Sequence, residues 1–212
     1  MNIYQISNRE TITLFPTFLH RAKLTDQNLL DQFQNKIYKL REEGRGFTKR
    51  NVFVSIDCLQ DEPELAPLKN IVLQETKQIL DKLTAVRDSH YITHMWAHIT
   101  PPRHRHMIHT HPNSFLSGTL YVKTPKDCAP VLFSDPRPAV PILVPEYREY
   151  NRNNCGTYTV QPQRGDLLIF PSWLPHGVDE GECGDDEERI VIAFNVMLKG
   201  KINNRDTETL VL

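Results

Sequence analysis

The first ninety residues carry apolar side chains at helical spacing. One run follows Thr25 and ends at Gly44, and a second opens at Pro67. A period of three to four residues places apolar side chains on one face of a helix, which can then pack against a core. Thr25 is a suitable N-cap, Gly44 a suitable C-terminal stop, and Pro67 a favourable first helical residue. The two apolar stripes are Leu29, Leu30, Phe33, Ile37, Tyr38 and Leu40, and then Leu68, Ile71, Val72, Ile79, Leu80 and Leu83.

The pattern changes after His90, where short runs rich in β-branched and aromatic residues alternate with Pro, Gly and Asn. Such runs are typical of strands. Closely spaced strands favour a sandwich or a barrel. At 212 residues the chain fits one domain. We therefore expect a single domain over 1–212, largely helical over 1–89 and sheet-rich over 90–199. The predicted strands are 91–99, 116–123, 130–134, 157–161, 166–170 and 189–198.

Composition and charge limit the classes of partner that this chain can be expected to bind. The formal net charge is −1 and the charges are scattered, which gives no basis for nucleic acid or a membrane surface as the main partner. No apolar run approaches the roughly 20 residues of a membrane span, and the start of the chain does not read as a signal peptide. The four cysteines form no C-x-x-C pair. We expect a reduced, cytoplasmic protein, monomeric or homodimeric.

Candidate metal ligands lie beside the predicted strands. His109 and His111 are two residues apart, just before the strand at 116–123, and His176 follows the strand at 166–170. Residues i and i+2 of a strand point to the same face, so both imidazoles can converge on one point. Three imidazoles with open positions suit Fe(II), Cu(II), Ni(II) or Zn(II) rather than Mg²⁺ or Ca²⁺. A structural zinc site would need a fourth protein ligand.

A second H-x-H pair, His104 and His106, weakens the argument from spacing alone. This pair lies between Pro101-Pro102 and two arginines, in a tract that reads as a loop. Nothing in such a tract fixes the geometry of the rings, and the positive charge repels a cation. The pair at 109 and 111 is therefore the better candidate.

The strand that begins at Arg189 can supply an anion site. Strand alternation places Arg189, Val191, Ala193 and Asn195 on one face, with bulky apolar residues on the other. An arginine fork matches a carboxylate with two hydrogen bonds. Alternatively, Arg189 pairs with the acidic run 185–188. Tyr121, in the strand at 116–123, can offer a hydroxyl to a bound acid or simply pack in the core.

The order of these motifs resembles a known family. It runs from Trp96 through H-x-H-P-N-S with S-G-x-x-Y-V, Asp135-Pro136-Arg137 and G-D-L-L-x-F-P-S-W-L-x-H-x-V to E-R-I-x-I-A-F-N. In that order the motifs are similar to those of the 2-oxoglutarate/Fe(II) oxygenase family whose members are mostly uncharacterised. The segments 109–122 and 165–195 are specific, and the helical part is not.

The resemblance implies a mainly β fold with flanking helices, namely a double-stranded β-helix (a jelly-roll, cupin-like barrel). It implies Fe(II) held by His109, His111 and His176 at the mouth of the barrel, with 2-oxoglutarate as cosubstrate. Arg189 would hold the distal carboxylate, and Tyr121 and Asn195 would complete the cosubstrate pocket.

One position departs from the wider superfamily, whose facial triad is H-x-D/E…H. Here His111 occupies the carboxylate position. The related family shares H-x-H, which supports the three-histidine set. Asp135 or Asp166 could substitute as a ligand, although no spacing favours either one.

The sequence therefore predicts an Fe(II)- and 2-oxoglutarate-dependent dioxygenase that hydroxylates a small-molecule or peptidyl substrate. One alternative is a cupin-type three-histidine oxygenase without cosubstrate, although cupins usually place a glutamate where Phe115 and Leu116 stand. Another is a non-catalytic metal- or sugar-binding barrel. The proline-rich segment 135–156 is a candidate lid. Because imidazoles must be neutral to bind metal, affinity should fall below their ordinary pKa of about 6.5.

Overall fold

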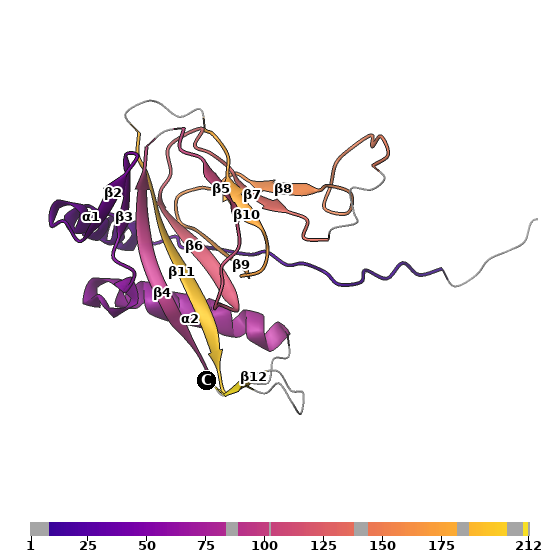
Figure 1. The fold of residues 1–212 in the computed structure, drawn as a ribbon, viewed down its shortest axis with the longest axis horizontal. Coiled ribbons are helices and arrows are strands. Elements are labelled where there is room, and N and C mark those ends of the chain that lie inside the picture. The colour runs from indigo at the N-terminus through magenta and orange to yellow at the C-terminus, as the bar shows by residue number, and fades with distance from the viewer. Residues whose placement is uncertain are drawn as a thin grey trace, which may run out of the picture.

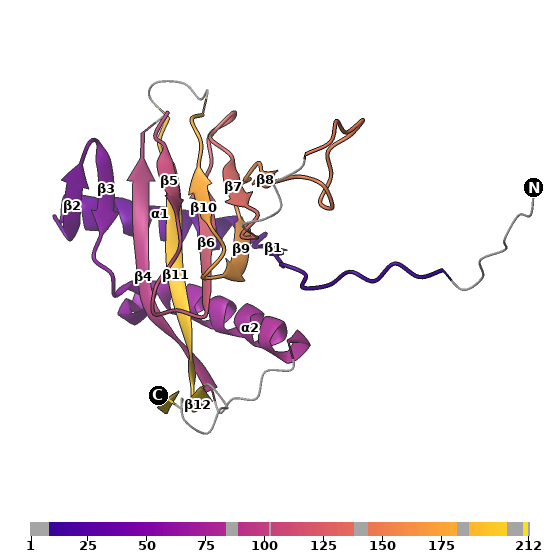
Figure 2. The same ribbon diagram turned by 45° about the vertical axis from the view of Figure 1, so that its right-hand side comes forward.

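Two β-sheets face each other, and two helices lie against the outer face of the larger sheet (Figure 1). The computed structural model describes residues 9–83, 89–101, 103–137, 144–181, 187–202 and 210–211. The smaller sheet lies in front of the larger one in Figure 2, with β5, β10 and β7 across β4, β11 and β6.

The larger sheet has the strand order β1-β9-β6-β11-β4-β3-β2 and the smaller sheet the order β5-β10-β7-β8. From β4 to β11 the chain alternates between the sheets, with one hairpin, β7–β8, inside the smaller sheet. This topology is the expected double-stranded β-helix. The larger sheet contains β1 His20–Lys23, β2 Gly46–Lys49, β3 Val52–Ser55, β4 Ser89–Thr100, β6 Leu116–Lys123, β9 Asp166–Pro171 and β11 Arg189–Lys199. The smaller contains β5 His106–His109, β7 Val131–Ser134, β8 Thr157–Val160 and β10 His176–Val178, and a separate pair joins β12 Lys201–Ile202 to β13 Leu210–Val211.

The two predicted helices are present as α1, Gln27–Glu42, and α2, Ala66–Lys82, preceded by the 3-10 turns η1, Leu59–Asp61, and η2, Pro63–Leu65. The predicted N-cap was wrong by one residue. Asp26 caps α1 by accepting a hydrogen bond from the Leu29 amide, whereas the Thr25 carbonyl accepts from the Gln27 side chain. Gly44 adopts a φ of +67°, the left-handed conformation that ends a helix.

The first ninety residues are less helical than expected, because they also contain β1, β2 and β3. These strands have four residues each, which is too short for a clear alternation. Strands β2 and β3 form a hairpin around Arg50 and Asn51, whose φ angles are +50° and +62°. Two positive φ angles are typical of a tight hairpin turn, but Arg-Asn is a weaker signal than Asn-Gly.

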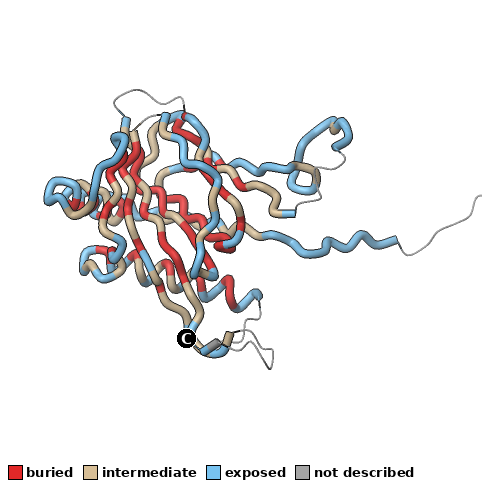
Figure 3. The backbone as a smooth tube through the Cα atoms, viewed as in Figure 1, coloured by how far each residue is buried: buried red, intermediate tan, exposed pale blue. Residues whose placement is uncertain are grey.

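The main core lies between the helices and the larger sheet. Leu30, Phe33 and Ile37 of α1 pack in one cluster with Ile192 and Phe194 of β11. Figure 3 shows the buried backbone concentrated in the central strands and on the inner sides of the helices. The helices thus cover one face of β11 and leave the other face to the space between the sheets.

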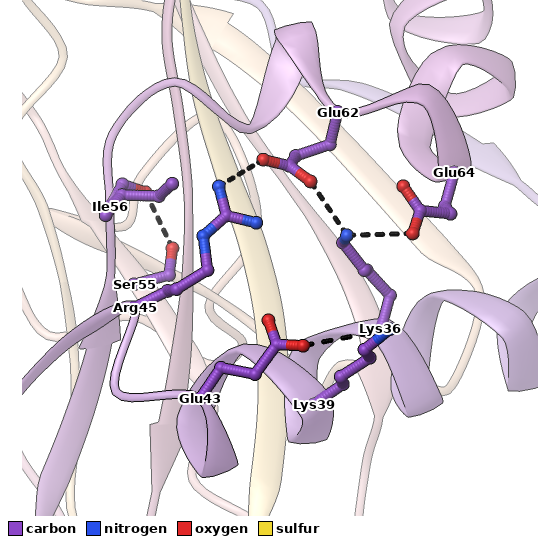
Figure 4. Close-up of polar contacts among 8 residues, drawn as sticks. All are labelled: Lys36, Lys39, Glu43, Arg45, Ser55, Ile56, Glu62 and Glu64. Carbon is purple, nitrogen blue, oxygen red and sulfur yellow. Dashed lines mark hydrogen bonds and ion pairs between the residues drawn. The ribbon is translucent and has the colours of Figure 1, made fainter.

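A buried lysine ties α1 to the segment before α2 (Figure 4). The Lys36 ammonium lies 2.7 Å from a Glu62 carboxylate oxygen and 2.9 Å from one of Glu64. The Arg45 guanidinium binds the other oxygen of Glu62. Hydrogen bonds from Arg45 and Lys36 lower the pKa of Glu62 to about 2. Because the Lys36 side chain is only 8% exposed, its charge depends on these partners.

Glu62→Gln is expected to lower the free energy of unfolding by about 1–3 kcal/mol at pH 7, because two charge-assisted hydrogen bonds lose their anion. The exposed pair Lys39–Glu43, 3.7 Å apart, is the matched control, and Glu43→Gln should cost at most about 0.5 kcal/mol. Urea unfolding measures both values. Equal effects for the two variants would contradict a structural role of the Lys36 cluster. Since the pKa of Glu62 is lowered, its contribution is complete above about pH 4.5 and is lost as the pH falls toward about 2.

Candidate metal and cosubstrate site

Three histidines meet between the sheets. His176 begins β10, and its register partner in the neighbouring strand β5 is His109. His111 lies two residues beyond, and its amide donates to the Ser172 carbonyl at 2.9 Å. One potential ligand atom from each of His109, His111 and His176 lies within 4.8 Å of the others. The structure therefore brings together all three residues predicted as metal ligands.

The placement of the H-x-H segment differs in one respect from the prediction. His109 ends a separate strand, β5, rather than opening the strand at 116–123, and His106 begins β5. The His106 ring stacks on that of His109, with centroids 4.5 Å apart. The assignment of His106 to a loop was therefore wrong, because pairing with β10 extends the strand. A Cβ on Gly177 would lie 2.7 Å from the His106 carbonyl oxygen, so a glycine allows this close approach.

Backbone carbonyls orient two of the three imidazoles. His109 Nδ1 lies 2.9 Å from the Met107 carbonyl oxygen, and His176 Nδ1 lies 2.9 Å from that of Leu174. A carbonyl oxygen only accepts, so each Nδ1 carries the proton and each Nε2 presents a lone pair. His111 Nε2 lies 3.1 Å from His176 Nε2. Nitrogen lone pairs that converge in this way fit a bound cation.

The surroundings keep these rings neutral. Burial, together with the neighbouring imidazoles, lowers the pKa of His176 to about 3 and that of His111 to about 4. Neutral imidazole is the form that ligates a metal. At neutral pH, His111 and His176 can therefore bind a metal without first losing a proton.

Arg189 lies at the start of β11 and is 7% exposed. Its Nη1 donates to the Ala129 carbonyl at 3.3 Å, and its buried Nε has no partner. No described carboxylate pairs with Arg189; of the run 185–188, residues 185 and 186 lie outside the described residues, and Glu188 pairs with Arg41. A buried guanidinium without an anion is costly, so this position fits an anionic ligand. As predicted from alternation, Ile190 and its apolar neighbours face the helices, whereas Val191 packs with Tyr121 on the opposite face.

One further residue near Arg189, His98, was missed by the sequence analysis. Trp96 Nε1 donates to His98 Nε2 at 3.0 Å, which leaves the proton of neutral His98 on Nδ1. Burial lowers the pKa of His98 to about 4, and the nearby positive charge of Arg189 contributes. The signal for His98 in the sequence was the alternation along the strand at 91–99, which places it with Trp96 on the face opposite Ala97 and Ile99.

The remaining candidates have these positions. Tyr121 is 2% exposed, and burial raises its pKa to about 12, so the phenol is neutral. Asn195 Oδ1 accepts from Ser117, which is its register partner on β6. Asp135 pairs with Arg137, and Asp166 pairs with Arg21 and Lys23. Neither aspartate belongs to the histidine cluster.

The proposed lid segment is only partly described, because 138–143 lie outside the described residues. The flanking parts of 135–156 line a cavity of about 810 Å³ together with the extended segment 13–19. Phe133 and Leu174 also line this cavity, and the Phe133 ring centroid lies 6.1 Å from that of His176. Whether the segment closes over a substrate stays a prediction.

Comparison with solved structures shows that other proteins of known structure share this fold. The chain is similar to a Pseudomonas putida prolyl-4-hydroxylase, with 14% identity, 84% of this chain and 92% of that chain covered, and a TM-score of 0.60. It is similar to HygX from Streptomyces hygroscopicus with nickel and 2-oxoglutarate bound, with 11% identity, coverages of 85% and 82%, and a TM-score of 0.57. It also resembles the non-heme alpha-ketoglutarate-dependent epimerase SnoN, with 10% identity, coverages of 85% and 76%, and a TM-score of 0.62. At these identities the likeness shows the fold alone.

The sequence itself matches one family model. Residues 94–195 match the family described as Putative 2OG-Fe(II) oxygenase. No curated protein sequence matches the chain. None of the described helices has the length and apolarity needed to cross a bilayer. The matched segment contains the three clustered histidines, Arg189, the six strands from β5 to β10 and the greater parts of β4 and β11. Residues 94–195, the part of the chain that contains the candidate metal site, are therefore similar to the 2OG-Fe(II) oxygenase family.

Proposed function

We propose that the chain is an Fe(II)- and 2-oxoglutarate-dependent dioxygenase that hydroxylates a C–H bond of a small-molecule or peptidyl substrate in the cytoplasm. The observation that carries the proposal is the combination of a three-histidine cluster with a buried arginine that has no described anionic partner. The first suits a divalent metal, and the second suits the distal carboxylate of a 2-oxo acid.

The residues present fit both groups. His109 and His176 have their Nδ1 protons on carbonyl oxygens, so their Nε2 atoms are available to Fe(II). Arg189 Nε and Nη2 can donate to a carboxylate, while Nη1 stays on the Ala129 carbonyl. When bound, Fe(II) and 2-oxoglutarate supply the chemistry, in which O2 is activated as the 2-oxo acid becomes succinate and CO2.

The chain itself would bind and orient the metal and the cosubstrate and would exclude water from the site. The carbonyls of Met107 and Leu174 hold two ligand rings in one tautomer. Arg189 sets the direction of the cosubstrate by holding its distal end. The Phe133 and Phe170 rings, 5.1 Å apart, pack beside His176 and keep this side of the site dry.

The cavity of about 810 Å³ supports a site for the prime substrate. Its volume lies in the range of ligand pockets, and its Phe133 wall adjoins His176. Its lining includes apolar side chains such as Phe133 and Leu174 and the polar side chains Arg137 and Arg152. This lining suits a substrate that has both apolar and polar groups.

A cupin-type oxygenase without cosubstrate and a metal-binding barrel without catalysis both explain the histidines. Neither explains Arg189, because a buried guanidinium without an anion would lower stability for no purpose. The affinity for 2-oxoglutarate therefore separates the proposal from both alternatives.

The test is an anaerobic titration of the Fe(II)-loaded protein with 2-oxoglutarate, followed by the visible metal-to-ligand charge-transfer band. Arg189→Met keeps the apolar stem and removes the charge. This variant should raise the dissociation constant for 2-oxoglutarate roughly 30-fold or more, because one partner of a buried charge pair is lost. Arg50→Met, at the exposed β2–β3 turn, is the matched control and should behave like the wild type.

If the iron-loaded wild-type protein gave no charge-transfer band, the proposal that it uses 2-oxoglutarate would be contradicted. A band with equal affinity in Arg189→Met and wild type would place the distal carboxylate elsewhere. Either result would leave the metal site itself to be judged by metal affinity.

A further inference from the structure

The His98 side chain points into the space between the two sheets. Its strand neighbours Ala97 and Ile99 belong to the core on the helix side, so alternation turns His98 to the other face of β4. There the centroid of its ring lies 6.0 Å from that of His106, which belongs to the smaller sheet. His98 is only partly buried, so a molecule bound between the sheets can reach its ring.

Arg189 lies close to His98 on the neighbouring strand, and β4 and β11 lie side by side in Figure 2. The register partner of His98 is Val191, which follows Arg189 by two residues. Ile190 packs in the core on the helix side, whereas Arg189 and Val191 face the other side. Diagonal neighbours in an antiparallel pair are about 7–8 Å apart, within reach of long and aromatic side chains. One ligand can therefore contact both Arg189 and His98.

Trp96 determines which nitrogen of His98 carries the proton. Trp96 Nε1 can only donate, and it lies 3.0 Å from His98 Nε2. Because Nε2 accepts this hydrogen bond, the ring is neutral and its proton is on Nδ1. Among the described residues, Trp96 is the one hydrogen-bond partner of the His98 ring, so the Nδ1–H group remains available to a ligand.

His98 stays neutral beside the Arg189 cation. Burial lowers its pKa to about 4, and the imidazole of His106 and the charge of Arg189 contribute. Val191 has Tyr121 as its register partner on β6, and the phenol of Tyr121 is neutral as well. Val191 is therefore flanked on both sides by neutral side chains that can donate hydrogen bonds.

Trp96 separates His98 from the candidate metal ligands. The centroid of the Trp96 ring lies 6.0 Å from that of His111 and 6.3 Å from that of His98. Among the described residues, no ring contact joins His98 to His109, His111 or His176. His98 therefore belongs with Arg189 rather than with the metal ligands.

We propose that His98, through its Nδ1–H group, is a second donor to the anion that Arg189 holds, and that Trp96 is the positioning residue that keeps the proton on Nδ1. The inference rests on the proposed function and deepens it, because the anion is then the distal carboxylate of 2-oxoglutarate. A carboxylate has two acceptor oxygens, which can bind the guanidinium and the imidazole N–H group together.

The first test is the dissociation constant for 2-oxoglutarate, measured by the charge-transfer band of the Fe(II)-loaded protein without oxygen. His98→Leu keeps apolar bulk and removes the donor. It should raise the dissociation constant roughly 10–100-fold, since hydrogen bonds to charged groups have this strength. His98→Gln should stay close to the wild type, because its amide oxygen can accept from Trp96 while its NH2 group donates to the carboxylate. A side chain that only filled space would not be replaced better by glutamine than by leucine.

The second test needs neither metal nor cosubstrate. Long-range ¹H–¹⁵N spectra of the metal-free, ¹⁵N-histidine-labelled protein report the tautomer of each ring. We expect the Nδ1–H form of His98 in the wild type and a mixture of tautomers in Trp96→Phe, which keeps an aromatic ring and removes the indole donor. The same variant should weaken the binding of 2-oxoglutarate less than His98→Leu does, because part of its His98 population keeps the donor.

Two controls separate the carboxylate from the metal. The dissociation constant for Co(II), measured by visible absorption, should be the same in His98→Leu and in the wild type, because His98 is outside the histidine cluster. His94→Leu, at an exposed position of the same strand, should bind 2-oxoglutarate like the wild type. Equal losses of Co(II) and 2-oxoglutarate affinity in His98→Leu would contradict the assignment of His98 to the carboxylate.

Equal affinity for 2-oxoglutarate in His98→Leu and the wild type, with weaker binding in Arg189→Met, would overturn this proposal and leave the proposed function intact. A wild-type protein that binds Co(II) but not 2-oxoglutarate would overturn both. If His98→Leu fails to fold, Trp96→Phe decides the question: an unchanged His98 tautomer together with unchanged 2-oxoglutarate affinity would refute the proposal.

Discussion

His176→Ala is expected to lower the affinity for Fe(II) or Co(II) by well over the roughly 10–100-fold that outer-shell changes cost. The variant removes one of three donors that lie within 4.8 Å of one another, and no fourth described His, Cys, Asp or Glu belongs to that cluster to replace it. Turnover of 2-oxoglutarate should fall with the affinity. Isothermal titration with Co(II) under anaerobic conditions measures the change.

His104→Ala is the matched control for this experiment. His104 belongs to the second H-x-H pair, and the structure does not include it in the cluster. Its replacement should leave the metal affinity close to that of the wild type. If His104→Ala lost the metal and His176→Ala retained it, the metal would be bound by the pair His104 and His106, and the proposed site would be wrong. Because His176 packs against Phe170 at 4.5 Å, circular dichroism of the metal-free variant must show that it is folded.

The metal-free protein is expected to lose several kcal/mol of stability as the pH falls from about 6.5 to about 4. Burial lowers the pKa of His98 to about 4 and that of His176 to about 3, against about 6.5 in the unfolded chain. The unfolded state therefore binds more protons than the folded state in this window, and stability rises with pH. One depressed histidine can contribute about 3 kcal/mol, because one pKa unit corresponds to about 1.4 kcal/mol. Urea unfolding at several pH values measures the slope.

His98→Gln tests the origin of this slope, because glutamine is of similar size and does not titrate. The variant should flatten the profile between pH 6.5 and 4. His94→Gln, an exposed position on the same strand, is the control and should follow the wild type. A wild-type stability that stays constant down to pH 4 would show that these histidines are solvated rather than buried.

The same surroundings change the expected pH dependence of metal binding. Ordinary imidazoles would begin to compete with the metal near pH 6.5. Since the pKa of His111 is lowered to about 4 and that of His176 to about 3, proton competition at these two rings begins at lower pH. The pH at which protons displace the metal should therefore be lower than the ligand types alone suggest. The sequence could not indicate this shift.

Local patterns were sufficient for both α-helices and for six of the strands in the described residues. The strand predicted at 116–123 is β6 as observed, and that at 189–198 is β11 with one residue added at its end. The helix at Pro67 is α2. The short strands β1, β2, β3, β5 and β10 were missed, because each has four residues or fewer and is formed by pairing with a neighbour. Their existence depends on contacts that are distant in sequence.

For the site, the sequence by itself determined the donor types and the face of β11 that bears Arg189, whereas His111 lies beyond the end of β5. These follow from side-chain chemistry and from the two-residue period of a strand, both of which are local. Only the tertiary structure decided that His176 lies opposite His109, that the charge of Arg189 acts on His98, and that Ser117 donates to Asn195. The reason is that sheet register sets the distances between strands far apart in the chain, and a shift of one residue would turn each of these side chains to the opposite face.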